Sequence, residues 1–320
     1  MLSGQDRSPG STHRSPLVPG RSGVAPCHQH QPSRRLCYHP VGTIWFCRVC
    51  SSAFGIVSLC FEDKVTDNPS NVPSLSLVIP AYNEALRIQQ TLDTAWSYLH
   101  QQPYESEIVL VDDGSLDATA ALAHDFASSH PGTRVLTIPH GGKAAAVRAG
   151  MLASHGDLVA FSDADLATPI TYLEEFRTAA LNGADVVIGS REGAGARRIG
   201  EPVYRHLMGR VFNLFVRATV LPSIQDTQCG FKLFRRQAAQ RILARARLYA
   251  APDDPVHGPR VTAFDVELLV IARRLGYRIE AIPVVWTYGS MSKVNPVSDT
   301  LTNIRDVLRV KCNDLRGRYQ

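Results

Sequence analysis

Short apolar runs of strand length alternate with helical patterns through most of this chain, and this alternation constrains the fold more than any other feature. The pattern over residues 86–99 places apolar residues three and four positions apart, as an amphipathic helix requires. The runs that we expect to form strands are residues 74–80, 107–111, 135–138, 157–161 and 185–189. Alternating β and α units predict an α/β fold, with a Rossmann-like, mostly parallel sheet and helices on both of its faces.

Charged side chains directly follow several of these expected strands. Asp112 and Asp113 come after one strand, Asp163 and Asp165 after another, and Arg191 closely follows a third. Because parallel strands end at one edge of a sheet, these side chains are expected to meet where α/β folds bind ligands. Taken alone, Asp-Gly-Ser after a strand is more often a turn and helix cap. Three such strand ends together favour a functional site.

The sequence Asp163-Ala164-Asp165 predicts a metal site. Alternate residues of an extended segment point the same way, so both carboxylates can address one cation. Hard oxygen ligands suit Mg²⁺ or Mn²⁺. Lys143 follows two glycines that let a ligand approach the backbone closely, and its ammonium group could neutralise a phosphate or stay solvated.

The composition excludes several classes of protein. The chain has 320 residues, of which 44% are hydrophobic and 20% charged, so it is neither a disordered tail nor a small disulfide scaffold. Its 34 basic and 29 acidic residues give a formal charge of +5. That excess is too mild to indicate nucleic acid as a partner, but it is compatible with a phosphate-bearing substrate or an anionic membrane.

The chain divides into a leader, residues 1–73, and a single catalytic domain, residues 74–320. The leader is rich in proline, and we expect residues 1–40 to be disordered. Residues 41–61 form a weak apolar segment, about as long as a bilayer span but diluted by serine, glycine and an arginine. A CxxC at residues 47–50 suggests zinc, but no second pair follows at a usable distance, so scattered thiols are the favoured interpretation.

Seven short motifs follow one another along the chain: Pro80-Ala81-Tyr82-Asn83-Glu84, Val111-Asp112-Asp113-Gly114-Ser115, Gly142-Lys143, Asp163-Ala164-Asp165, Gly189-Ser190-Arg191, Asp226-Thr227-Gln228-Cys229-Gly230-Phe231-Lys232 and Phe264-Asp265-Val266-Glu267. In this order they resemble the motifs of a known family, the family 2 inverting glycosyltransferases of GT-A fold. The similarity extends from about residue 75 to about residue 294, and its later motifs are similar to those of the subgroup that glucosylates dolichyl phosphate.

The resemblance implies a role for each matching residue. The nucleotide-sugar pocket would be formed by Pro80, Tyr82, Glu84, Asp112, Asp113, Lys143 and Asp163, with Asp226 and Gln228 facing the sugar and acceptor. Asp163 and Asp165 would form the metal site for Mg²⁺ or Mn²⁺, and the catalytic residues would be Asp163, Asp165, Arg191, Asp265 and Glu267. The acceptor phosphate would lie against Arg191 and an arginine of the following helix, either Arg205 by its spacing or, as the alternative, Arg210.

The implied reaction is inverting transfer of glucose from UDP-glucose to dolichyl or another polyprenyl phosphate, giving a β-linked product. A phosphate acceptor is already ionised at neutral pH, so positioning and charge matter more than a strong general base. Three departures from the family are Ala144 in place of a second glycine, the mixed Leu166-Ala167-Thr168, and Tyr288 and Met291 in place of a glutamate and a glycine. The second of these keeps GDP-mannose open as an alternative donor.

A lipid acceptor requires access to a membrane. Residues 205–221 are strongly apolar with interspersed arginines, and an apolar stripe at residues 301–308 lies beside basic residues, so both fit helices in the headgroup plane as well as core helices. We expect a membrane-associated enzyme whose site faces the cytoplasm, on the endoplasmic reticulum of a eukaryote or the inner face of a prokaryotic cell membrane. The alternatives are a soluble acceptor, a haloacid dehalogenase-like phosphohydrolase and a non-catalytic nucleotide-sugar-binding domain.

Overall fold

The computed structural model describes residues 36–38, 44–46, 72–249, 262–289 and 296–320. The chain forms two units, residues 1–68 and residues 69–320. In the first unit, strands β1 (Leu36–Tyr38) and β2 (Ile44–Phe46) pair antiparallel. The expectations of disorder over residues 1–40 and of a weak apolar segment over residues 41–61 otherwise lie outside the described residues.

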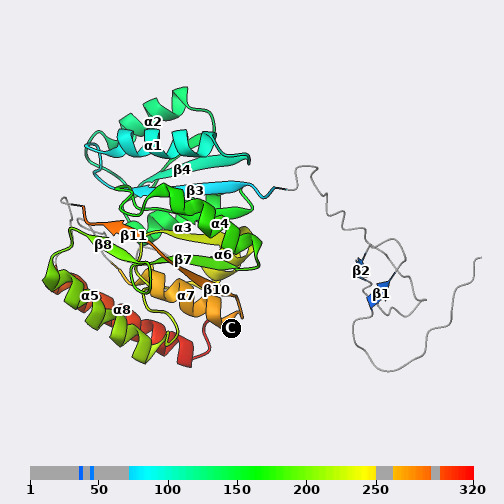
Figure 1. The fold of residues 1–320 in the computed structure, drawn as a ribbon, viewed down its shortest axis with the longest axis vertical. Helices are drawn as coiled ribbons and strands as arrows, with labels where there is room; N and C mark the ends of the chain where they lie inside the picture. The colour runs from blue at the N-terminus through cyan, green and yellow to red at the C-terminus, as the bar shows by residue number, and fades with distance from the viewer. Residues whose placement is uncertain (1–35, 39–43, 47–71, 250–261, 290–295) are drawn as a thin grey trace, which may run out of the picture. The chain divides into compact units, whose positions relative to one another are not determined.

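The second unit is built on a seven-stranded sheet, as the alternation of apolar runs predicts (Figure 1). The strand order is β10-β7-β9-β6-β3-β4-β5, and every neighbouring pair is parallel except the two that involve β9. The strands of this sheet are β3 (Leu75–Ala81), β4 (Ser106–Asp112), β5 (Thr133–Thr137), β6 (Leu158–Phe161), β7 (Val186–Ser190), β9 (Lys232–Arg235) and β10 (Ile279–Pro283). The five expected strands all form, and each end lies within two residues of its expected position.

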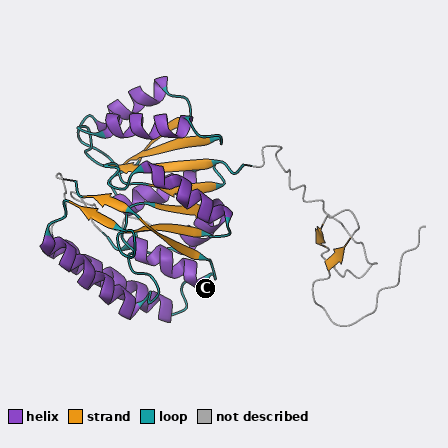
Figure 2. Cartoon of the chain, in the orientation of Figure 1, coloured by secondary structure: helices purple, strands orange, loops and turns teal. Residues whose placement is uncertain are grey.

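Helices cover both faces of this sheet (Figure 2). One face packs against α1, α2 and α4, and the other against α3, α6 and α7, with α5 and α8 contributing to the same core. The helices are α1 (Ile88–His100), α2 (Thr119–Ser129), α3 (Lys143–Ala153), α4 (Leu173–Leu181), α5 (Val203–Thr219), α6 (Arg236–Arg245), α7 (Phe264–Arg274) and α8 (Pro296–Leu315), with a 3₁₀ turn, η1 (Ile170–Tyr172), before α4. The mostly parallel sheet with helices on both of its faces therefore confirms the expected fold class.

The central strand β3 shows why both faces must be covered. Leu77 and Ile79 belong to the core on the α1 side, and Val78 between them belongs to the core on the α3 side. Successive residues of a strand point to opposite faces, so a strand with apolar residues on both faces has to be buried on both.

The reversed strand β9 decides what lies at the carboxyl edge of the sheet. Because β9 runs antiparallel to β6, its first residue, Lys232, is paired with the last residue of β6, Phe161. The segment before β9, residues 226–231, therefore reaches the same edge as Asp163 and Asp165. A parallel strand in this place would have carried the segment to the opposite edge.

A second, small sheet pairs β8 (Arg197–Ile199) in parallel with β11 (Val285–Thr287). It follows the ends of β7 and β10, since Val284 donates its backbone N–H to the carbonyl of Ser190. Among the described parts of the chain, no helix combines the length and the apolar character needed to span a bilayer.

Candidate active site

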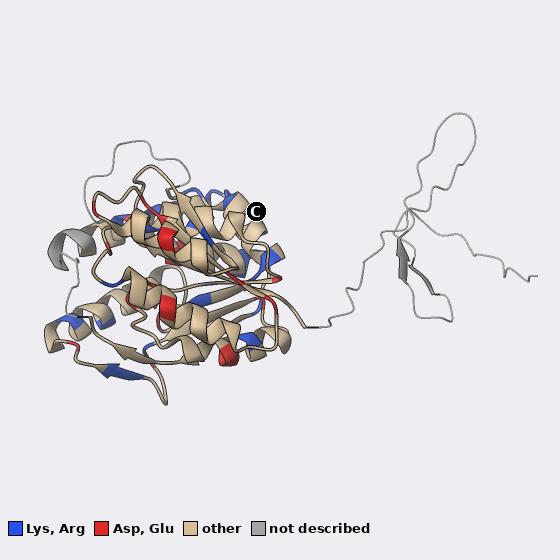
Figure 3. Ribbon diagram, turned by 90° about the horizontal axis from the view of Figure 1, so that it is seen from above, with Lys and Arg blue, Asp and Glu red and all other residues tan. Residues whose placement is uncertain are grey.

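A cavity of about 450 Å³ lies at the carboxyl edge of the sheet. Its walls come from the ends of β3, β4 and β6, from the starts of α3, α5 and α7, from α8, and from the segment after β11. Basic and acidic positions alternate over the whole unit (Figure 3), so the sign of charge alone does not mark this site. The identity of the site comes from the arrangement of individual side chains.

Asp163 and Asp165 both line this cavity, just beyond the end of β6. Asp163 forms an ion pair with Lys143, and its carboxylate lies directly over Gly230, where a Cβ atom would be 2.0 Å from Oδ2. Asp165 accepts a hydrogen bond from the backbone N–H of Ala167 at 3.1 Å. Burial, and next the nearby charge of Asp163, raise the pKa of Asp165. Only glycine at position 230 leaves room for the Asp163 carboxylate in this position.

The donor set fits a hard divalent cation. Two oxygen ligands lie beside each other in a cavity, and a cation would relieve the repulsion that raises the Asp165 pKa. Within the described residues, no group of three or more His, Cys, Asp or Glu side chains is placed to hold a metal ion. Mg²⁺ and similar ions bind substrate phosphates through one or two carboxylates, so this set suits an ion that is shared with a phosphate ligand.

Lys143 is placed by a loop that Asp113 anchors. The Asp113 carboxylate accepts hydrogen bonds from the backbone N–H groups of Gly141 at 2.8 Å and Gly142 at 2.9 Å, and Nδ1 of His140 lies 2.9 Å from it. Burial raises the Asp113 pKa. Gly142 has a φ of 83°, which glycine adopts without strain, and α3 begins at the next residue. The loop thus directs Lys143 at the Asp163 carboxylate.

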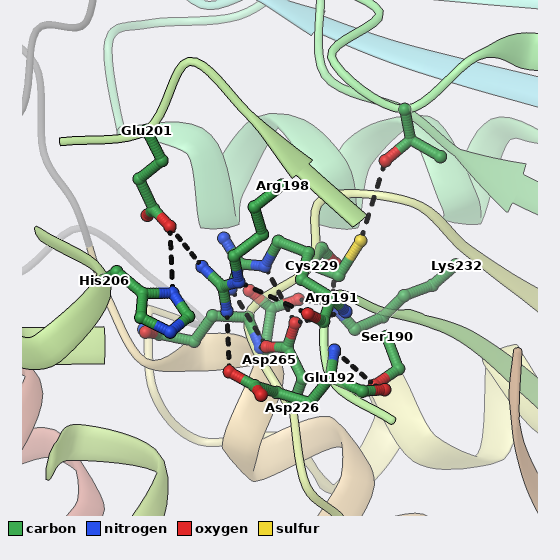
Figure 4. Close-up of polar contacts among 12 residues, drawn as sticks. Ser190, Arg191, Glu192, Arg198, Glu201, His206, Asp226, Cys229, Lys232 and Asp265 are labelled. Carbon is green, nitrogen blue, oxygen red and sulfur yellow. Dashed lines mark hydrogen bonds and ion pairs between the residues drawn. The ribbon is translucent and has the colours of Figure 1, made fainter. Parts of the chain in front are cut away.

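Arg191 directly follows the end of β7, and its side chain is held in place by Asp226 (Figure 4). Its Nε and Nη2 atoms donate to the two carboxylate oxygens at 2.7 and 2.9 Å, and its backbone N–H donates to the same carboxylate at 2.9 Å. Asp226 is fully buried, which by itself would raise its pKa, but the attraction of Arg191 holds that pKa well below its usual range. Asp226 is therefore the ionised anchor of Arg191, which lines the cavity while Asp226 lies behind it.

Two of the arginines that line the cavity, Arg191 and Arg205, each pack against an aromatic ring. The Arg191 guanidinium carbon is 5.4 Å from the ring centre of Trp286, and that of Arg205 is 5.1 Å from the ring centre of Tyr288. Arg205 also donates a hydrogen bond from Nη1 to the Tyr288 hydroxyl at 3.1 Å. Trp286 and Tyr288 are two positions apart at the end of β11, so the pleat points both rings the same way. The two ring centres are 6.0 Å apart, and each ring contacts one of the two guanidinium groups.

Asp265, at the start of α7, is held by a lysine from the reversed strand. Lys232 is completely buried and donates from Nζ to Asp265 at 2.7 Å and to the carbonyl of Cys229 at 2.5 Å. A buried ammonium is tolerated only with such partners. Asp265, held in this way, lines the cavity.

Comparison with known proteins agrees with this geometry. Residues 76–243 match the model of the family described as glycosyl transferase family 2. This chain belongs to that family. Within it, the chain is similar to dolichyl-phosphate beta-glucosyltransferases, with 32% identity over 272 residues to the Homo sapiens protein (80% of each chain) and 31% over 267 residues to the Dictyostelium discoideum protein (79% of this chain, 78% of the relative). A Trichomonas vaginalis relative of the same description is 36% identical over 239 residues, covering 71% of this chain and 67% of its own.

Solved structures show the same fold. Glucosyl-3-phosphoglycerate synthase from Mycobacterium tuberculosis, in complex with Mn²⁺ and UDP-glucose, matches this family 2 chain with a TM-score of 0.51 and 21% sequence identity. The match covers 77% of this chain and 79% of the synthase.

Most of the residues predicted from the sequence of this glycosyltransferase meet in the one cavity. Those that line it are Pro80, Tyr82, Glu84, Asp113, Lys143, Asp163, Asp165, Arg191, Arg205, Gln228 and Asp265. Between the two candidates for the second arginine, the structure brings Arg205 to the cavity. Arg210 is more than half exposed, 4.0 Å from Glu192, and outside the lining.

Asp112, Asp226 and Glu267 do not line the cavity, although the resemblance assigned all three to the site; Asp226 instead binds Arg191 from behind. Asp112 is buried, accepts a hydrogen bond from the backbone N–H of Ser115 at 3.2 Å, and is not part of the cavity lining. Glu267 follows Asp265 by two positions on α7, a rotation of about 200° on a helix, so the two carboxylates cannot face one cavity.

Glu267 instead supports the polypeptide behind the cavity. It accepts hydrogen bonds from the backbone N–H groups of Arg247 and Leu248 at 3.0 and 2.9 Å, and from the Tyr319 hydroxyl at 2.7 Å. Burial raises the Glu267 pKa. Its contacts tie the end of the chain to the segment after α6.

Several residues that line the cavity were not predicted from the sequence, among them Arg87, His140 and Arg198. Arg87 had a usable signal, because it follows Glu84 by three positions and forms an ion pair with it at 2.8 Å. His140 precedes the two glycines of the Lys143 loop, and its ring stacks on Tyr82 with the centres 4.0 Å apart. Arg198 carries no motif, and only the pairing of β8 with β11 brings it to the site.

Proposed function

We propose that this glycosyltransferase moves glucose from UDP-glucose to dolichyl phosphate or a similar polyprenyl phosphate, with inversion at the sugar. One observation carries the proposal: a single cavity is lined both by a carboxylate pair with Lys143 and by two arginines, Arg191 and Arg205. Such a site suits a diphosphate donor and a separate anionic acceptor. The dolichyl-phosphate beta-glucosyltransferases to which the chain is 31–36% identical support the same substrates.

The acceptor reacts without needing a base. Its phosphate oxygen is already ionised at neutral pH and attacks the sugar C1 carbon, while the bond from C1 to the UDP oxygen breaks and UDP leaves with the electron pair. Arg191 and Arg205 bind and orient the acceptor phosphate, with their guanidinium groups fixed by Trp286 and Tyr288. Attack from the side opposite the leaving group converts an α-linked donor into a β-linked product.

On the donor side, the negative charge of the departing diphosphate has to be neutralised. Lys143 supplies one positive charge there, and Asp163 and Asp165 would hold a divalent cation, Mg²⁺ or Mn²⁺, which stabilises negative charge on the phosphates. Tyr82, stacked on His140, together with Pro80 and Glu84, forms the wall assigned to the nucleotide. Gln228 and Asp265 also line the cavity and are assigned to the sugar hydroxyls.

The direct test is UDP release by the full chain. The assay combines UDP-glucose or GDP-mannose with Mg²⁺ or Mn²⁺, in detergent, with and without dolichyl phosphate. The proposal expects release that requires UDP-glucose, a divalent ion and the lipid phosphate together, and a β-linked glucosyl phosphate as product.

Other outcomes would replace the proposal. Release only with GDP-mannose would make this a mannosyltransferase, and tight UDP binding without turnover on any acceptor would indicate a binding domain. Release of inorganic phosphate without any need for UDP would indicate a phosphohydrolase.

We also assign the membrane contact to one surface, the α5–α8 face. Helices α5 and α8 contact each other and lie side by side (Figure 1). The exposed apolar residues of this face are Val203, Leu207, Val211 and Leu214 on α5, and Leu301, Leu308 and Leu315 on α8. On α5 they recur every three or four positions, so they form one stripe. Arg205, which lines the cavity, lies on the same helix.

Charge supports a lipid surface as the occupant of this face. Helix α5 contains no acidic residue, and Asp306 and Asp314 of α8 are buried. Where the structure describes the side chains of these two helices, the exposed charges are Arg210, Arg217, Arg305 and Arg309, and the exposed Arg316 directly follows α8. An apolar stripe flanked by arginines fits the headgroup plane of an anionic membrane. A cytoplasmic leaflet, of the endoplasmic reticulum in a eukaryote or the inner membrane in a prokaryote, has this charge.

Replacing Leu207 and Leu214 by aspartate is expected to weaken membrane binding about tenfold or more, because apolar burial is lost and the new charges repel anionic lipid. Co-sedimentation with phosphatidylcholine vesicles, with and without phosphatidylserine, measures the effect. Leu181→Asp, at the exposed end of α4, is the matched control. Equal weakening by the control, or unchanged binding by the double variant, would remove the assignment.

A further inference from the structure

Arg198 is a buried cation in the cavity wall that the proposed reaction does not use. It lies on β8, opposite Trp286 of β11, and its side chain is only 9% exposed. Its Nη1 atom donates to Glu201 at 2.9 Å, its Nη2 atom to Glu192 at 3.0 Å, and its Nε atom to the carbonyl of Arg191 at 3.3 Å (Figure 4). Each nitrogen of the guanidinium group thus has an oxygen partner in the protein.

The two glutamates that pair with Arg198 also contact side chains of helix α5. Glu201 lies 3.3 Å from Nδ1 of His206, and Glu192 lies 4.0 Å from Nη1 of Arg210. His206 and Arg210 are four positions apart, so they share one side of the helix. The result is a row of alternating charge, which we call the Arg198 bridge: His206, Glu201, Arg198, Glu192 and Arg210.

The Arg198 bridge joins the two elements that carry the cavity arginines. At its middle, Arg198 holds the backbone of Arg191 through the carbonyl oxygen, and at both ends the bridge contacts the first turns of α5, where Arg205 precedes His206. Glu192 is further fixed by Ser190, whose hydroxyl donates to the Glu192 carbonyl at 2.8 Å. The separation of Arg191 from Arg205 therefore depends on contacts through Arg198.

Removing the Arg198 charge would also change the electrostatics of the acceptor side. The side chains of Glu192 and Glu201 are 18% and 8% exposed, so water screens them poorly. Without Arg198, two carboxylates near the cavity wall would repel a phosphate and compete for the neighbouring arginines. With it, the wall stays close to neutral and the charges of Arg191 and Arg205 act on the acceptor.

We infer that Arg198 is a positioning residue for the acceptor: it neutralises Glu192 and Glu201 and fixes β8 against α5, and it does not itself bind the acceptor phosphate. This inference rests on the proposed transfer to a lipid phosphate. It assigns to the Arg198 bridge a role in the affinity for the acceptor and none in the affinity for the donor.

The first variant is Arg198→Gln in the full chain. We expect the apparent KM for dolichyl phosphate to rise about 10- to 100-fold, the cost of leaving a buried charge partner unpaired. The KM for UDP-glucose should stay within about twofold, because the donor side of the cavity is unchanged. Arg236→Gln is the matched control, since Arg236 pairs with Asp157 near the amino end of β6 and should change neither constant. Equal increases in both constants for Arg198→Gln would overturn the inference.

A triple variant separates positioning from direct binding. In Glu192→Gln/Arg198→Gln/Glu201→Gln no carboxylate is left unpaired, so we expect most of the acceptor affinity to return. If Arg198 bound the phosphate itself, the triple variant would be as impaired as Arg198→Gln, and the inference would be wrong. The triple variant also carries the test if Arg198→Gln fails to fold, as thermal unfolding will reveal. Absence of turnover by the unchanged protein would instead count against the proposed function.

Discussion

Asp165→Asn is expected to reduce turnover about 1,000-fold while leaving the fold intact. The variant keeps the shape of the side chain and its hydrogen bond from Ala167, but it removes one of the two negative charges that would hold the cation. Loss of charge stabilisation on a leaving diphosphate costs several kcal/mol, and each 1.4 kcal/mol is a factor of ten in rate. UDP release in the presence of UDP-glucose and dolichyl phosphate measures the loss.

Binding measurements make this expectation independent of turnover. Titration of Mn²⁺ into the protein with UDP present should show strong binding for the unchanged chain and much weaker binding for Asp165→Asn. Asp157→Asn is the matched control, because Asp157 lies just before β6, at its amino end, and bonds to Ser74. If Asp165→Asn kept most of the activity and of the Mn²⁺ affinity, the metal site would have to be elsewhere.

Asp226→Asn is expected to lower the free energy of unfolding by about 3 kcal/mol and to weaken acceptor binding as well. The substitution leaves the Arg191 guanidinium buried without its ionised partner, and breaking one side of a buried ion pair typically costs this much. Asp314→Asn is the matched control, since its partner Arg274 is 45% exposed and such a pair contributes less. Chemical unfolding of the three proteins at neutral pH gives the comparison.

The contribution of the Asp226–Arg191 ion pair to the free energy of unfolding is expected to depend on pH. The pKa of Asp226 is depressed in the folded protein, so its ion pair stabilises the fold at neutral pH, above the unfolded pKa. This contribution is lost as the pH falls below about 4, where aspartate in the unfolded chain takes up a proton. The stability difference between the unchanged protein and Asp226→Asn should therefore shrink as the pH is lowered. A difference independent of pH would mean that shape, and not charge, holds Arg191.

The carboxyl-edge residues were predictable because their signals are local. A few adjacent residues were enough to predict the buried strand that precedes Asp163-Ala164-Asp165. The same holds for the strand that ends just before Arg191. Parallel pairing then brings such ends to one edge without any further information. Arg205 was favoured over Arg210 by spacing alone, and the cavity contains Arg205.

The errors came from side-chain direction. Asp265 and Glu267 read as a pair in the sequence, but α7 turns the second carboxylate away from the cavity to the backbone of Leu248. Asp112 and Asp113 are likewise adjacent, and only Asp113 lines the site. Neighbouring residues point in different directions on a helix or a strand, so adjacency does not imply a shared role.

The sequence by itself determined the α/β alternation, the strands that end in charged residues, and the carboxylate pair at the carboxyl edge, because periodicity and turn chemistry act over a few residues. Tertiary structure alone decided the reversal of β9, the pair of Arg191 with Asp226 across 35 positions, and the contact of Arg205 with Tyr288 across 83. It also placed Arg198 between two glutamates beside α5. These contacts depend on which distant strands pair, and no local preference records that choice, since it is set by how the whole core is buried.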